Sequence, residues 1–149
     1  MYFFLFQEAI ICLKGIQAEY HVKAIEFFAN KVIQQNQKDV DDVVKLFKDI
    51  VSSKTCDIDT FKKGFKGTLD FLTDIGVDKP LAYPFTGQLL FGAGLEFSDV
   101  TKLLKSLDDD KLIGKIVRGY TTALKNAVVI NLNKKFQFQI IMCRIFFFL

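Results

Sequence analysis

The sequence has no tryptophan, one histidine and only two prolines among its 149 residues. With His21 as the single histidine, neither a zinc site of the common spacings nor a Ser-His-Asp or Cys-His catalytic set can be assembled. Cys12, Cys56 and Cys143 lie far apart and form no CxxC pair. We therefore expect no enzyme, no metal and no cofactor, and we expect His21 to be an ordinary residue of a helix.

Export and membrane signals are also scarce. The first six residues, MYFFLF, are apolar but lack a basic leader, and Arg144 interrupts the apolar segment at the other end. We therefore expect no membrane partner. Because an odd number of cysteines without a secretory leader favours a reducing compartment, we expect a cytoplasmic location, with the nucleus as the alternative.

Charge is distributed unevenly. All 17 acids lie before residue 127, where 17 of the 20 bases balance them, so the net charge of +3 comes from Lys134, Lys135 and Arg144. A balanced chain is weak evidence for a nucleic-acid surface. RNA contact through lysines that lie beside aromatic residues, such as Lys62 and Lys66, stays an open alternative.

Apolar residues recur three or four positions apart through most of the chain, which is typical of amphipathic helices. Between Pro80 and Gly94 we expect either a helix kinked by Pro84 or one that starts later. The spacing predicts other helices at about residues 8–13, 19–35, 40–51, 61–72, 98–107 and 111–125. Expected N-caps are Asp39, Asp57 or Asp59, Ser98 and the Asp108–Asp110 run. The expected inner side chains of the second helix are Tyr20, Ala24, Phe27, Phe28 and Val32.

The predicted fold is all-α, with antiparallel helix pairs stacked on one another. Residues 127–149 are expected to be different: an irregular, Phe-rich, basic and apolar tail, with a place outside the fold as an alternative. Phe136, Phe138 and Ile140 alternate with polar residues, so a local strand is an alternative there.

The most informative stretch runs from residue 61 to residue 84. Phe61, Phe65, Leu69 and Leu72 fall on one side of a helix, and the small residues beside them allow another helix to approach closely. We therefore predict that this helix is central to the core.

Two acids, Asp74 and Asp78, follow that helix around Gly76, and Pro80 comes next. A carboxylate at a helix C-terminus opposes the helix dipole and costs up to about 1 kcal/mol. Such a pair suggests that an external partner supplies the compensating charge. The alternative is that Asp78 is the N-cap of the following helix, with Pro80 in its first turn and Asp74 simply solvated.

Two segments, QEAIICLKGI (7–16) and FKKGFKGTLDFLTDIGVDKPLAYPFTGQLL (61–90), resemble the MA-three domain family. The resemblance covers roughly residues 7–126. It implies an all-α domain of HEAT-like helix pairs of the kind found in the translation initiation factor 4 gamma scaffold. It also implies a partner, the DEAD-box RNA helicase initiation factor 4A.

In that family the two acids of the turn before the proline contact the helicase, so the resemblance assigns partner binding to Asp74 and Asp78, with Pro80 shaping the turn. The expected function is a protein-interaction module in translation initiation or its regulation. The alternative is a helical-repeat scaffold of RNA processing, splicing or nucleolar, that binds RNA or another protein.

Overall fold

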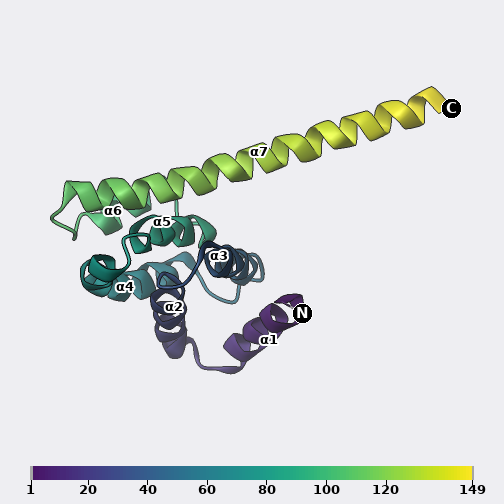
Figure 1. Ribbon diagram of the computed structural model, residues 1–149. Coiled ribbons are helices and arrows are strands. Elements are labelled where there is room, and N and C mark those ends of the chain that lie inside the picture. Colours follow the sequence, from purple (N-terminus) through teal and green to yellow (C-terminus); the bar gives the residue numbers. More distant parts are fainter. Residues whose placement is uncertain (1, 149) are drawn as a thin grey trace.

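The computed structural model describes the backbone of residues 2–148 and the side chains of residues 8–140. The described chain forms seven helices and no strand, which confirms the all-α prediction (Figure 1). The helices are α1 (Tyr2–Gly15), α2 (Ala18–Val32), α3 (Gln37–Ser52), α4 (Ile58–Asp78), α5 (Ala82–Gly92), α6 (Phe97–Leu104) and α7 (Asp110–Phe148).

The helices stack in series. The main contacts join α2 to α4, α3 to α5, and α5 to α7, consistent with stacked helix pairs. Figure 1 shows α7 along one side of the body and α1 on the other. The helix α1 is joined to α2 by His21, whose Nε2–H donates to the carbonyl of Leu13 at 2.7 Å, and Leu13 itself is buried. His21 is thus a structural residue of a helix, as expected, and it is buried rather than on the surface.

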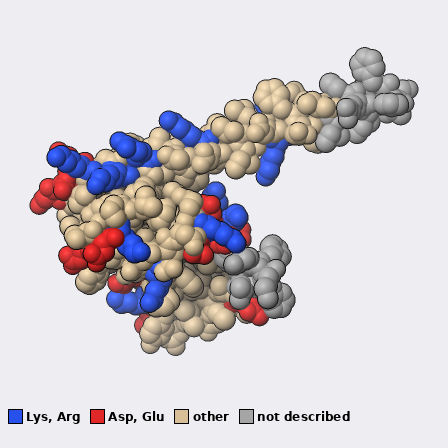
Figure 2. Space-filling model, viewed as in Figure 1, with Lys and Arg blue, Asp and Glu red and all other residues tan. Residues whose placement is uncertain are grey.

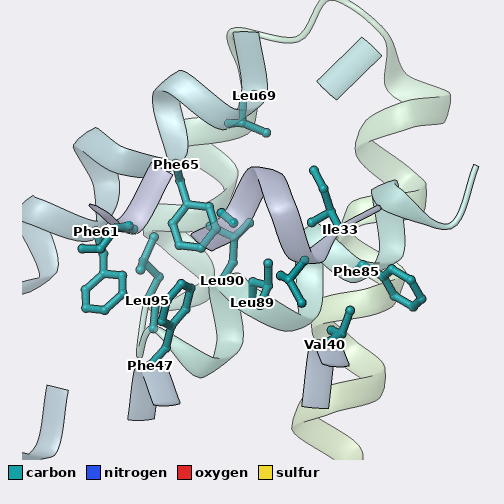
Figure 3. Close-up of a cluster of buried hydrophobic side chains, with 14 of the residues drawn as sticks. Ile33, Val40, Phe47, Phe61, Phe65, Leu69, Phe85, Leu89, Leu90 and Leu95 are labelled. Carbon is teal, nitrogen blue, oxygen red and sulfur yellow. The ribbon is translucent and has the colours of Figure 1, made fainter. Parts of the chain in front are cut away.

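The core is centred on α4. Phe61, Phe65, Leu69 and Leu72 are all buried, so the predicted stripe is confirmed. Figure 3 shows the first three of them. Phe47 of α3 meets Phe61 and Phe65 edge-on, with ring centroids 5.1 and 6.1 Å apart. Such edge-to-face pairs add stability beyond the area they bury, which fixes α3 against α4.

The small residues of α4 let α2 pack closely against it, as predicted. A Cβ at Gly64 would lie 2.8 Å from Cγ2 of Ile25, so only glycine allows this approach. The inner face of α2 is only partly the one expected from the sequence: Val32 is buried, and Ala24 and Phe28 are half-buried against the core. The fully buried residues of α2 are His21, Ile25, Ala29 and Val32. Tyr20 and Phe27 are exposed instead, because the stripe that contacts α4 is rotated by one position around α2.

A proline-containing helix forms the middle layer. Pro84 is the third residue of α5, within the first turn, where backbone N–H groups have no intrahelical acceptor. The helix needs no kink there. Gly87 of α5 and Gly119 of α7 let the two helices touch backbone to backbone: a Cβ at Gly119 would lie 2.6 Å from the Cα of Pro84.

The helix caps correct two expectations. Asn36, not Asp39, is the N-cap of α3, and its side chain accepts the N–H of Asp39 at 3.1 Å. Ser98 lies inside α6 rather than before it, and Glu96 takes the N-cap position without a side-chain hydrogen bond. Of the two predicted caps of α4, Asp57 takes the N-cap position and Asp59 lies inside the helix. Asp109 accepts two backbone N–H groups at the start of α7, which confirms an acidic cap there.

The end of the chain differs most from the prediction. The helix α7 passes residue 126 without a break and continues to Phe148, so an irregular tail or a local strand was wrong for residues 127–148. No glycine or proline follows Gly119 to end the helix, and an alternation of only five residues has no strand beside it to pair with. The side chains of Cys143 and Arg144 lie outside the described residues.

Candidate functional site

The candidate site is the C-terminal end of α4. This helix starts at a defined cap: the Asp57 carboxylate accepts the N–H of Thr60 at 2.7 Å and its hydroxyl at 2.6 Å. These two hydrogen bonds hold the pKa of the Asp57 carboxyl below its usual range. From there α4 runs for 21 residues, so Asp74 and Asp78 lie one turn apart on the same face, and both are exposed.

The helix continues through Gly76, so the acids are part of α4 rather than of a turn. Asp78 is its last residue, and α5 begins four positions later without a side-chain cap. The alternative that Asp78 is an N-cap was therefore wrong. No base lies in the last turn of α4, so both carboxylates oppose the helix dipole as expected.

Pro80 lies just after α4 and shapes the corner between α4 and α5. A proline disfavours helical geometry in the residue before it, and Lys79 has φ −131° and ψ 77°. Pro80 then occupies the second position of a four-residue turn, closed by the N–H of Ala82, which donates to the carbonyl of Lys79 at 2.9 Å. Proline favours this turn position because its φ is already set.

Tyr83 of α5 packs on the end of α4 and also holds the corner between the two helices in place. Gly76 is buried beneath Tyr83 of α5, and a methyl group at position 76 would overlap the Tyr83 ring. The ammonium group of Lys115, from α7, lies 5.2 Å from the centre of the same ring. Three helices therefore meet at this residue, which fixes the direction in which the end of α4 points.

The acidic surface is larger than the sequence suggested. Asp70 lies one turn before Asp74, and it too is exposed, so Asp70, Asp74 and Asp78 form an acidic row along the last two turns of α4. No ion pair to any of the three is formed within the described chain. Exposed apolar side chains, Phe71 and Val77, border the row, and Val77 is 78% exposed.

Asp70 was missed by sequence reasoning, although its spacing of four residues before Asp74 was a usable signal. The other end of α4 is electrostatically different. Lys62 pairs with Asp99 of α6 at 3.2 Å and with Asp59 at 3.6 Å. The hydrogen bond to Asp99 raises the pKa of Lys62. Among the described side chains, Asp70, Asp74 and Asp78 have no ion pair of this kind at the C-terminal end.

Other side chains with reactive chemistry do not gather around this row. Between residues 8 and 140, no group of three His, Cys, Asp or Glu side chains is placed to hold a metal ion. Burial, followed by the nearby Asp57 charge, raises the pKa of the Cys56 thiol to about 11, whereas Cys12 is exposed. Within the described residues, no helix has the length and apolar character needed to cross a bilayer.

No protein-family model matches this chain, and no solved structure matches it.

Proposed function

We propose that this chain is a protein-interaction module, not an enzyme, that docks a DEAD-box RNA helicase of the initiation factor 4A type. Its role would lie in translation initiation or in the regulation of that step, in the cytoplasm. The observation that carries the proposal is the exposed, unpaired pair Asp74 and Asp78 at a helix end held in place by Pro80 and Tyr83. The resemblance to the MA-three family, which uses the corresponding acids, supplies the identity of the partner.

The chemistry of the acidic row supports a basic protein surface as the partner. Two carboxylates one turn apart can each accept a bidentate arginine, and such charge-assisted bonds are about twice as strong as neutral ones. The helix C-terminus adds its own partial negative charge. The exposed side chains of Phe71 and Val77 supply apolar area beside the charges, as in many protein interfaces. Because the corner is already ordered, little conformational entropy is lost on binding.

The test is a calorimetric titration with purified initiation factor 4A. Changing Asp74→Ala together with Asp78→Ala should weaken binding at least about tenfold, which corresponds to about 1.4 kcal/mol. Helicity should not decrease, because neither side chain makes a hydrogen bond or an ion pair within the described chain and both oppose the helix dipole.

A matched control is Asp49→Ala with Asp108→Ala. It removes the same number of exposed carboxylates from α3 and from the connection before α7, so net charge changes equally. This control should keep the affinity of the unaltered chain. Equal weakening by both pairs would mean that only net charge matters and would refute the site. Salt-sensitive RNA binding without any helicase binding would instead favour the RNA-processing alternative.

A further inference from the structure

The helix α7 is longer than the body it covers. Ile116 and Tyr120 anchor its first half in the core, and a groove against α3 and α5 is lined along α7 as far as Ile130. Beyond that residue α7 continues past the body (Figure 1). Its outward side, opposite Ile116 and Tyr120, is therefore accessible along the whole described length.

The first half of this outward side is basic. Lys111, Arg118 and Lys125 recur every seven residues, close to two helical turns, so they share one face, and all three are exposed. This basic row spans about 21 Å. Figure 2 shows Lys and Arg side chains spaced along α7, with acidic side chains near its start. After Asp110 the helix contains no acid, and the described chain forms no ion pair to Lys111, Arg118 or Lys125.

The second half of the same side is apolar. Leu132 extends the seven-residue spacing of the basic row, and Val129, Phe136 and Ile140 lie beside it. These four side chains form an apolar stripe of about 17 Å, and each is roughly half exposed or more. The reverse side of this segment is mixed, with Asn131 and Lys134 beside Ala127 and Phe138. The apolar stripe itself points away from the body, on the same side as the basic row.

We infer that the outward side of α7 binds a membrane surface rich in anionic lipids, with the helix lying in the plane of the headgroups. Phosphate and carboxylate headgroups would neutralise the basic row. The apolar stripe would enter the boundary between headgroups and acyl chains, where large apolar side chains of membrane-surface helices are buried. An RNA backbone would satisfy the basic row equally well but would leave the apolar stripe in water. The combination on one face therefore favours lipid over nucleic acid.

This inference departs from the expectation of no membrane partner. The difference arises because the basic row and the apolar stripe share a face only if the helix continues unbroken past residue 126. It is independent of helicase docking: α5 lies between α7 and α4, so a bilayer on the outward side of α7 leaves the acidic row accessible.

The test is co-sedimentation of the full chain with vesicles of phosphatidylcholine, alone or mixed with phosphatidylserine. The mixed vesicles should bind at least about tenfold more tightly, and added salt should reduce the difference. Phe136→Gln should weaken binding about tenfold, because this ring would no longer be buried in lipid. Phe138→Gln is the matched control: Phe138 is 64% exposed and Phe136 is 62% exposed, but they lie about 200° apart around the helix. Phe138→Gln should change binding less than about twofold.

The charges are tested in the same way. Arg118→Gln with Lys125→Gln should remove the preference for phosphatidylserine, whereas Lys63→Gln with Lys134→Gln removes two charges elsewhere and should preserve it. Equal binding to both vesicle types, or equal loss with Phe136→Gln and Phe138→Gln, would overturn the inference. So would RNA binding that depends on Arg118 and Lys125 without vesicle binding. Asp74→Ala with Asp78→Ala should leave vesicle binding unchanged, which separates this test from the helicase test.

Discussion

Two glycines five residues apart in α7 should respond in opposite ways to the same substitution. Gly114 is exposed, and a Cβ added there would have nothing within 4 Å. Gly119 is buried against α5, where a Cβ would lie 2.6 Å from the Cα of Pro84 and closer to its carbonyl oxygen. Gly114→Ala tests helix propensity alone, whereas Gly119→Ala adds a collision with backbone.

The magnitudes follow from those surroundings. Alanine in a helix interior is more stable than glycine by about 1 kcal/mol, so Gly114→Ala should raise the free energy of unfolding by about that amount. At Gly119 the same gain in helix propensity is outweighed by strain, because the added Cβ collides with the backbone of Pro84. Carbon atoms rest about 3.5–4.0 Å apart, so α5 and α7 must separate by about 1 Å. That shift also disturbs the buried Tyr120, whose hydroxyl donates to the carbonyl of Leu95 at 2.9 Å. We expect a strain of about 3 kcal/mol and a net loss of about 2 kcal/mol.

Urea unfolding followed by circular dichroism measures both changes. The midpoint should rise for Gly114→Ala and fall for Gly119→Ala, without a change in the slope of either transition. A Gly119→Ala variant as stable as the unaltered chain would show that α5 and α7 do not approach as closely as described. A loss of stability in Gly114→Ala would refute the assumption that its surroundings are open.

Two further predictions concern side chains next to the start of α4. Asp57→Ala should lower stability at neutral pH by about 1 kcal/mol through loss of the N-cap. Because hydrogen bonds from Thr60 lower the pKa of Asp57 in the folded state, the contribution of its charge is complete above the unfolded pKa of about 3.9 and is lost as pH falls through the folded value. The difference in stability between the two proteins should thus shrink in acid, where only a neutral cap remains, and Asp57→Asn should keep that neutral cap; a pH-independent difference would count against this reasoning. In a Cys143→Ser background, a thiol reagent should modify Cys12 quickly at pH 8 and Cys56 only on unfolding, because Cys56 is buried with a pKa of about 11; equal rates would refute its burial.

The end of α4 could be predicted from the sequence only in part. The spacing of Phe61, Phe65 and Leu69 gave its inner side correctly, because this helix is amphipathic enough to have one good way to face the core. The helix was predicted to extend to about residue 72, whereas it continues through Gly76 to Asp78. Gly76 is required there by the Tyr83 ring that packs on it.

The buried side of α2 was predicted less well than that of α4. Apolar residues surround much of α2, so the sequence favoured Tyr20 and Phe27 as inner side chains over His21 and Ile25. The observed choice depends on Gly64, which leaves room for Ile25 on the facing helix. Such complementarity between two surfaces is absent from the periodicity of either helix alone.

The sequence by itself determined that the chain is helical, where α4 starts and which of its sides is buried, because these depend on spacing and caps within a few residues. It also showed Asp74 and Asp78 as acids at a helix end. Only the tertiary structure decided that these acids share an acidic row with Asp70 and that the row is exposed and unpaired. It likewise decided that the basic row and the apolar stripe of α7 face away from the body. Exposure is a property of which helices pack together, and that depends on contacts between residues far apart in the chain.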